Sequence, residues 1–207
     1  MKKAVSRRDF MKGAAVVAAS AVLAGCSGEK PLTWENSKTN QYFKVHGVTA
    51  EKYEIEGELS TGGNKATVIF SRDGEKARYE TQYETQGIGY LTDGKTIYMK
   101  FNDEGYVKGN DDWNDANAPT MVPMIQKGAG IFVVPTAKTI VSVSSGTYPF
   151  NGKEYKKETF EINDGSVVGS YSYCFEGNEL KFIITSTQML TITKISASPT
   201  FPFPANK

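Results

Sequence analysis

The chain has 207 residues, and removing a leader of 25 residues leaves a mature chain of 182, a length typical of one β-rich domain. Hydrophobic residues make up 39% and charged residues 23%, which are the values of a globular protein and exclude an intrinsically disordered chain. The leader carries five of the 24 basic residues and one of the 23 acidic residues, so the formal charge falls from +1 to −3 when it is removed. A slightly acidic domain argues against electrostatic binding to nucleic acid, and two cysteines exclude a disulfide scaffold or a zinc knuckle.

The N-terminal segment resembles a twin-arginine export signal. Arg7 and Arg8 are followed by the bulky apolar Phe10, and residues 14–24 then form an almost entirely apolar run. With a rise of about 1.5 Å per residue, this run is too short to cross a hydrocarbon core of about 30 Å. We therefore interpret residues 1–25 as a signal peptide rather than a transmembrane helix. The alternative is a buried N-terminal helix with an incidental pair of arginines.

The leader ends in Leu23-Ala24-Gly25-Cys26, which resembles a bacterial lipobox. In such lipoproteins the cysteine begins the mature chain and its sulfur carries a diacylglyceryl group. Two acyl chains on one cysteine are enough for stable anchoring. Residues 26–36 have no periodicity and are predicted to be a lipidated tether. We therefore expect the mature protein on the extracytoplasmic side of the cell membrane, with the membrane as its partner through the lipid on Cys26.

A short helix is predicted directly after this tether. Ser37 suits its N-cap position, and Tyr42 and Phe43 supply an apolar face. Gly47 followed by Val48 is typical of a helix C-terminus, where a glycine takes the left-handed conformation and its neighbour makes an apolar contact.

The remaining sequence predicts a single β-rich domain over 37–207. From residue 53 to 59, apolar residues alternate with glutamates, which indicates a half-buried strand with its acidic side chains in water. Pairs such as Asn151-Gly152 recur at strand-length spacing and suit tight hairpins, which make neighbouring strands antiparallel. We expect about nine to eleven strands in one strongly curved antiparallel sheet, a mainly β fold with minor α. Further strands are predicted at residues 66–70, 76–85, 96–101, 153–162, 167–176, 180–187 and 189–195.

Two stretches depart from the strand alternation. Residues 102–119 are rich in Asp, Asn and Gly and are predicted to form a loop. Thr120 is then expected to cap a short helix whose first turn tolerates Pro123 and which ends at the Gly-Ala-Gly of residues 128–130. The proline-rich tail, residues 198–207, is expected to pack as an extended edge because proline cannot donate to an interior ladder.

This order of elements resembles the LolA-like and LppX/LprG-like lipoproteins. Residues 93–98 (DGKTIY) resemble the family's "D-G-K-x-x-Y" hairpin, and Tyr155 with Phe160 resembles a later strand of the family. Residues 177–182 lie where the family often has a turn, and residues 201–204 resemble its closing "F-x-x-P". The resemblance implies a half-open β-barrel with short helices on its concave side. It also implies that a lipid or a lipoprotein is carried between the sheet and the helices.

No residue pattern indicates catalysis, and the protein is predicted not to be an enzyme. His46 is the only histidine and lies at the end of the predicted first helix, where it stabilises the helix dipole or is solvated. Glu54, Glu56 and Glu58 share one strand face, a pattern more typical of a solvated face than of a glycosidase pair. The aspartates of residues 103–115 fit no EF-hand register, and no nucleotide-binding glycine motif is present. We therefore expect no cofactor and no metal.

Two functions stay open. One is a membrane-anchored, non-catalytic carrier or binder of an amphipathic or lipid ligand, whose contacts would be Met121, Met124, Ile125 and Phe132 in a mobile lid over the sheet. The other is a structural or interaction lipoprotein of the cell envelope with a closed core. An empty apolar cavity distinguishes the first function from the second. With either function we expect a monomer that binds no nucleic acid, and Cys174 is expected to be a buried free thiol.

Overall fold

The computed structural model of the protein describes residues 31–165 and 167–205. All helices and strands of the described residues lie in one compact unit, Leu32–Lys207. Within the described residues, no helix is both long and apolar enough to span a bilayer.

Four residues with predicted functions belong to the leader and its cleavage site. Arg7, Arg8 and Phe10 of the predicted export signal and the predicted lipidation residue Cys26 lie outside the described residues. The fold therefore bears only on the domain that follows them.

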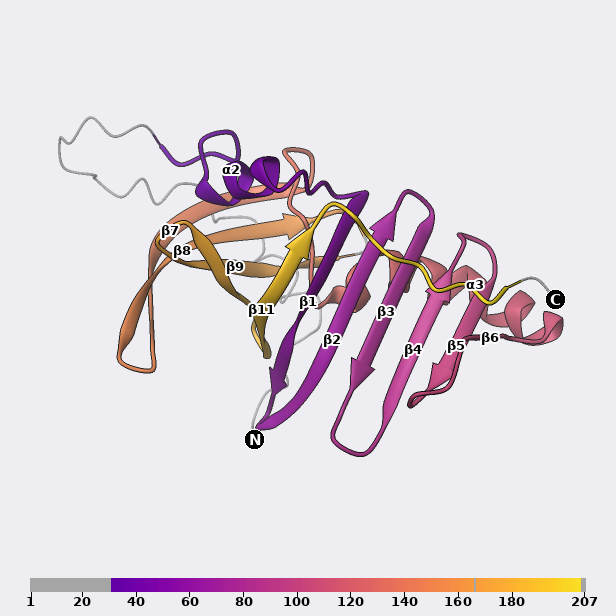
Figure 1. Ribbon diagram of the computed structural model, residues 1–207. Helices are drawn as coiled ribbons and strands as arrows, with labels where there is room; N and C mark the ends of the chain where they lie inside the picture. The colour runs from indigo at the N-terminus through magenta and orange to yellow at the C-terminus, as the bar shows by residue number, and fades with distance from the viewer. Residues whose placement is uncertain (1–30, 166, 206–207) are drawn as a thin grey trace, which may run out of the picture. The chain divides into compact units, whose positions relative to one another are not determined.

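Eleven antiparallel strands form one open sheet in the order β6-β5-β4-β3-β2-β1-β11-β10-β9-β8-β7 (Figure 1). Every neighbouring pair is consecutive in the chain except β1 and β11, which join the two halves of the sheet. The predicted curved, half-open and mainly β fold is therefore confirmed. The strands are β1 (Lys52–Thr61), β2 (Asn64–Asp73), β3 (Lys76–Gln82), β4 (Gly87–Thr92), β5 (Ile97–Phe101), β6 (Val107–Lys108), β7 (Ile140–Phe150), β8 (Lys153–Asn163), β9 (Val168–Glu176), β10 (Glu179–Ile184) and β11 (Gln188–Ser196).

Hairpin chemistry explains most of this topology. At the β7–β8 turn, Asn151 and Gly152 have φ values of 49° and 75°, the two left-handed residues that a type I′ turn requires. The sequence pattern misses β4, β6 and β7. Strand β4 contains two glycines, β6 has two residues, and β7 is exposed on both faces, so none of the three has the alternation of a half-buried strand.

Helix α2 (Lys38–Val45) confirms the predicted first helix. The Ser37 hydroxyl accepts a hydrogen bond from the Asn40 N–H as the N-cap. The Glu158 carboxylate, on β8, accepts hydrogen bonds from the N–H groups of Lys38 and Thr39, both at 2.8 Å, and from the Thr39 hydroxyl at 2.7 Å. A carboxylate at a helix N-terminus also complements the helix dipole, so Glu158 fixes this end of α2 on the sheet.

Helix α3 (Asp111–Gln126) begins earlier than the sequence predicts. The predicted loop is wrong for residues 111–119, and Asn110, not Thr120, is the N-cap, with its side-chain oxygen 2.8 Å from the Trp113 nitrogen. Asp111 and Asp112 in the first turn complement the helix dipole, although an Asp- and Asn-rich sequence is also typical of a loop. The predicted end of the helix is confirmed by the 3₁₀ turn at Gly128–Gly130.

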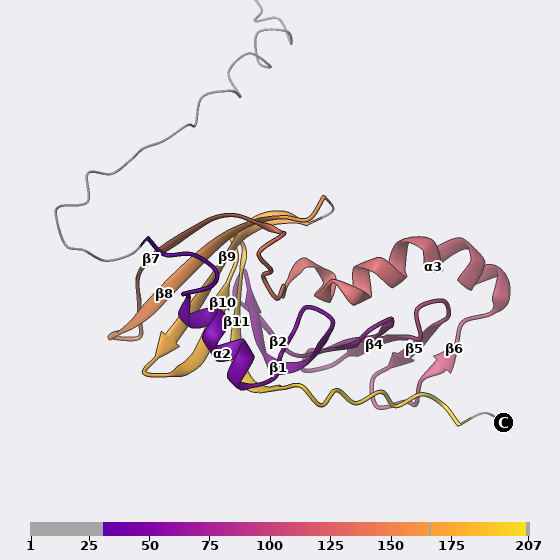
Figure 2. The same cartoon turned by 90° about the horizontal axis from the view of Figure 1, so that it is seen from above.

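The main core lies on the inner face of the sheet, which is the face that carries Ile55, Phe70 and Tyr173. Phe43 from α2 and Phe132 from the segment after α3 pack into this core. Figure 2 shows α3 on one side of strands β1–β6 and the C-terminal tail on the other.

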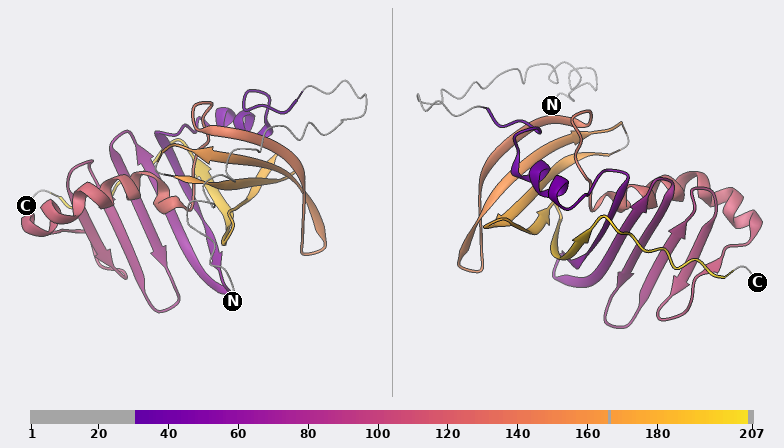
Figure 3. Two further views of the ribbon diagram at one scale, coloured as in Figure 1. Left: turned by 180° about the vertical axis from the view of Figure 1, so that it is seen from behind. Right: turned by 45° about the horizontal axis from the view of Figure 1, so that its top comes forward.

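The tail corrects two predictions. It is extended, as expected, but it crosses the outer face of β1–β5 instead of lying at an edge (Figure 3, right), and Phe203 contacts the Tyr98 ring at a centroid distance of 5.4 Å. Glu54, predicted to face water, is only 2% exposed because the tail and the side chain of Lys194 lie over it. Its carboxylate accepts hydrogen bonds from the N–H and hydroxyl of Thr200 at 2.9 and 2.8 Å.

Candidate functional site

The four predicted ligand contacts do not meet in one site. Ile125 is 1% exposed and packs with Met121 against β3 and β5, in an apolar cluster beneath α3. Phe132 is also 1% exposed but belongs to the main core, where its ring lies 5.1 Å from that of Tyr53. Met124 belongs to neither cluster and is 40% exposed.

A small cavity lies beside Phe132. It has a volume of ≈ 100 Å³ and borders Tyr53, Arg72 and the segment after α3. Ligand pockets commonly have volumes of about 300–1,000 Å³. The space at Phe132 is thus too small for an acyl chain in the described conformation.

Helix α3 covers only one end of the inner face of β3–β5. Near its N-terminus, the Asn114 side-chain oxygen accepts a hydrogen bond of 2.7 Å from the Ile97 N–H. At its C-terminus, the Gln126 amide donates to the Glu75 carbonyl at 2.8 Å. Both contacts lie at the end of the sheet with the β2–β3 and β4–β5 hairpins, and Figure 3 (left) shows the opposite end of these strands uncovered by any helix.

The uncovered end carries an open platform of three large apolar side chains, Tyr83, Ile88 and Phe101. Ile88 and Phe101 form a cross-strand pair of β4 and β5, and Tyr83 directly follows β3. Tyr83 is 44% and Phe101 52% exposed, and a hollow of ≈ 280 Å³ lies between the three. Tyr83 and Phe101 are exposed and Ile88 is half-buried, and apolar side chains that are contiguous on an exposed face are typical of a contact surface.

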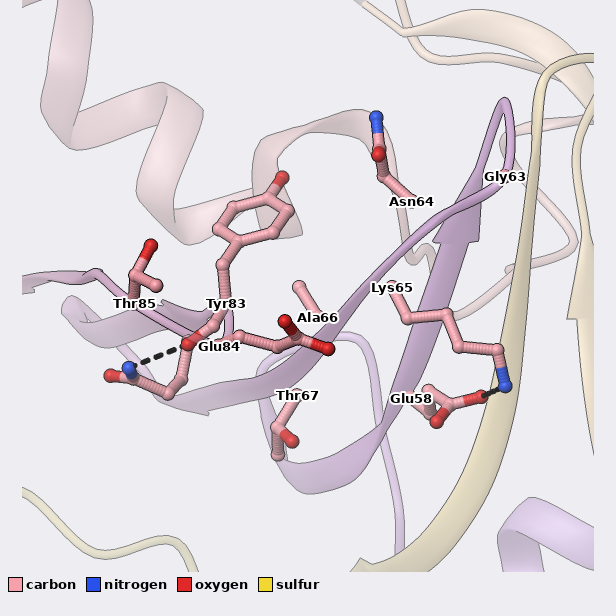
Figure 4. A pocket seen from close by; sticks show the side chains of 10 residues that line it. Glu58, Gly63, Asn64, Lys65, Ala66, Thr67, Tyr83, Glu84 and Thr85 are labelled. Carbon is pink, nitrogen blue, oxygen red and sulfur yellow. Dashed lines mark hydrogen bonds and ion pairs between the residues drawn. The ribbon is translucent and has the colours of Figure 1, made fainter.

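A larger and more polar notch of ≈ 650 Å³ adjoins the platform at Tyr83. Figure 4 shows the Tyr83 ring and the Asn64 amide directed to one side of the strands, while Glu58 and Lys65 lie on the other side. Glu58 and Lys65 form an ion pair of 2.7 Å. On the side of the strands that carries the platform, the notch is bordered by Tyr83 and the Asn64 amide, so a polar group lies beside the apolar surface, a pattern that an amphipathic molecule matches.

The sequence pattern does not identify Tyr83, Ile88 or Phe101 as site residues. Ile88 lies in β4, which the strand pattern misses, and Phe101 ends the predicted strand at residues 96–101, where an apolar residue indicates burial more often than exposure. Their exposure depends on where α3 crosses the sheet, and no local sequence pattern contains this information. The only local signal is Tyr83, an aromatic residue at the start of a polar turn.

A buried cluster of charged side chains lies on the outer face of the sheet, behind the platform. The Glu80 carboxylate is bonded by Arg78, Lys100 and the Tyr106 hydroxyl, the last at 2.6 Å. Burial raises the pKa of Glu80, but these three hydrogen bonds outweigh burial and hold the pKa below its ordinary value. Burial and the Glu80 carboxylate raise the pKa of Tyr106. This cluster connects β3 to β5 and to the loop after β5, on the face of the sheet opposite the platform.

Residues 4–24 match the model of the TAT (twin-arginine translocation) pathway signal sequence. The chain carries a twin-arginine export signal. The matched segment includes Arg7 and Arg8, and a signal of this kind directs export across the cytoplasmic membrane.

Neither curated proteins nor solved structures assign this chain to a family. No curated protein matches the chain in sequence. Among solved structures, one described as PNGF-II in the C2 space group is 12% identical, and the match covers 73% of this chain and 28% of that one, with a TM-score of 0.24. A TM-score this low assigns neither fold nor function. The LolA-like resemblance therefore stays a hypothesis.

Proposed function

We propose that the protein is a non-catalytic exported lipoprotein, anchored to the membrane by lipid on Cys26, that binds an amphipathic ligand on the inner face of its sheet. The observation that most supports ligand binding is the open platform of Tyr83, Ile88 and Phe101, which begins where α3 stops covering the sheet. The apolar part of the ligand lies on this platform, and its polar part lies in the adjoining notch. The LolA-like resemblance implies a ligand between the sheet and the helices, whereas this platform lies on the same face of the sheet but outside the area that α3 covers.

Helix α3 serves as a movable element beside this site, over the adjoining part of the inner face. Pro119 and Pro123 lie inside it, and each removes one intrahelical N–H donor, which weakens the helix. Opening α3 would join the apolar cluster around Val122 and Ile125 to the platform and make one longer apolar surface. Each methylene of a ligand on this surface contributes about 0.8 kcal/mol, so a long acyl chain offsets a modest cost of moving α3.

A structural or interaction lipoprotein with a closed core is the second candidate. The cavity of ≈ 100 Å³ beside Phe132 favours it, because a carrier needs more space there.

Ligand binding is tested on the fragment 27–207 by native mass spectrometry and by titration with a fluorescent fatty acid. Phe101→Ser should weaken binding of the probe about tenfold or more, since a large apolar contact is lost. The matched control is Val168→Ser, at a side chain that is 74% exposed on β9, far along the sheet from the platform. Equal affinity of the two variants, or no binding by the parent fragment, would favour the closed-core lipoprotein.

The anchor is tested separately in cells. Cys26→Ala should abolish incorporation of labelled fatty acid, and replacing Arg7 and Arg8 by lysine should leave precursor in the cytoplasm. Continued labelling of the Cys26→Ala protein would contradict the lipoprotein assignment without touching ligand binding.

A further inference from the structure

Strand β7 is a long, exposed edge of the sheet. It has eleven residues, and among the described residues its only strand partner is β8. The sequence from Ile140 to Phe150 contains no charged residue, and most of it is exposed on both faces. The opposite edge, β6, has two residues, one of which is Lys108, and the chain leaves it directly for α3.

Edges of natural sheets are normally protected from pairing by charges, prolines, bulges or short length. In β7 the bulge lies at the start of the strand, between Ile140 and Ser142. The proline, Pro149, is the second-last residue of the strand. The seven residues 142–148 between them carry none of these features. This stretch therefore presents free backbone N–H and C=O groups to another strand.

The position of Pro149 indicates which groups are free. A proline in an edge strand is placed where its missing N–H would point to solvent. Hydrogen bonding alternates along an antiparallel strand, so Val143, Ser145 and Thr147 share the outward direction with Pro149. Ser145 is the middle residue of β7.

We propose that two copies of the protein pair through β7, antiparallel about a two-fold axis at Ser145. A two-fold axis places β7 of one copy opposite β7 of the second copy, so a charged side chain on β7 would lie close to the same charge on the other copy. The uncharged β7 avoids this repulsion. The pairing also places Val143 opposite Thr147 and Ser142 opposite Tyr148, which are favourable strand neighbours. Because only one edge is long enough to pair, association stops at the dimer.

Sedimentation velocity of the fragment 27–207 tests the proposal. The parent fragment should sediment as a concentration-dependent dimer. Ser145→Lys and Ser145→Glu should each raise the dimer dissociation constant about tenfold or more, since like charges then face each other across the axis. An equal mixture of the two variants should pair again, which a misfolded variant could not do. The matched control is Ser170→Lys, at an exposed position on the interior strand β9, which should leave the dimer unchanged.

A second measurement does not depend on introducing a charged side chain. Ser145→Cys should form a disulfide-linked dimer on mild oxidation, because directly opposite Cα atoms in an antiparallel pair are about 5.5 Å apart or less, within the range of a disulfide. Ser170→Cys should not. The proposal is overturned if the parent fragment is a monomer at high micromolar concentration, which is the state expected from the sequence. It is also overturned if disulfide cross-linking is equally efficient from position 145 and from position 170.

Discussion

Glu158 and Glu54 each hold a segment that has no strand partner of its own. Glu158 accepts three hydrogen bonds from the first turn of α2, and Glu54 accepts two from Thr200 in the tail. Both carboxylates lie on strands and receive these bonds from residues more than a hundred positions away in the chain. Single side chains thus position the helix and the tail on opposite faces of the sheet.

Glu54→Gln should destabilise the domain by about 1–3 kcal/mol, measured by urea unfolding of the fragment 27–207. The amide keeps the size of the side chain but loses the ion pair with Lys194 and weakens the charge-assisted bonds to Thr200 and Ser71. Glu56→Gln is the matched control, because Glu56 shares Lys194 but is half-buried and does not contact the tail. Equal losses for the two variants would show that the tail contact contributes nothing.

Cys174 should react slowly with thiol reagents in the folded domain. It is fully buried on the outer face with Tyr155 and Phe182, as expected from the sequence. Burial raises the pKa of the thiol to about 11, so little thiolate exists at neutral pH. Labelling by a disulfide reagent should become fast only on unfolding, whereas a Cys174→Ser/Ser170→Cys variant should label promptly when folded. Prompt labelling of the native parent would contradict burial.

Among the elements, α2 and the hairpins were predictable and α3 was not. The N-cap Ser37 and the left-handed Gly47 are local signals, and the Asn151-Gly152 turn is another. The start of α3 lies in a sequence that suits a cap and a loop equally well, and Pro119 argues against a helix. Its stability comes from packing on β3–β5, which is a tertiary property.

The same distinction applies to individual faces of the sheet. Alternation correctly predicts that Tyr53, Ile55 and Leu59 face the core. It cannot predict that the tail covers Glu54, because the covering residues lie about 145 positions further along the chain. The exposure of Phe101 likewise depends on which part of the sheet α3 crosses. Local pattern therefore identifies strands, and only the assembled molecule identifies the platform.

The face that α3 presents to the sheet can be tested with two neighbouring residues. Ile125→Ala should cost about 2–5 kcal/mol of unfolding free energy, because the side chain is 1% exposed and its removal leaves a cavity. Met124→Ala should change it by no more than about 0.5 kcal/mol, since that side chain is 40% exposed. Urea unfolding of the fragment 27–207 measures both. A larger effect at Met124 would mean that the helix is rotated relative to the described packing.

At the scale of the whole domain, β1 and β11 form the strand pair that joins the two halves of the described sheet. A bulge lies in this pair between Glu56 and Gly57, and a Cβ at Gly57 would lie 2.3 Å from the Thr191 carbonyl oxygen. The pair can approach this closely only with glycine there. Lys194 on β11 bonds both Glu54 and Glu56 on β1, so one cation connects the strands on the outer face next to the bulge.

Acid should weaken this junction. Burial raises the pKa of Glu54, but the hydrogen bonds from Lys194 and Thr200 outweigh it and bring the pKa to about 2, below the ordinary value of 4.5. A carboxyl group whose pKa is lowered by folding contributes stability that is fully present above its unfolded-state pKa and is lost as the pH falls through its folded-state pKa. The melting temperature should therefore be constant from neutral pH to about pH 5 and should fall steadily between pH 4.5 and 2.

The Glu80 cluster adds to this acid dependence in the same direction, because its pKa is also lowered. The contribution of Glu54 is isolated by comparing the parent fragment with Glu54→Gln, which has no proton to gain at this position. The variant should start from a lower melting temperature at neutral pH and lose less of it between pH 4.5 and 2, so the two curves should converge in acid. Parallel curves would mean that Glu54 is protonated at the same pH in the folded and unfolded chains, and that the clamp on the tail and the β1–β11 junction does not depend on its charge.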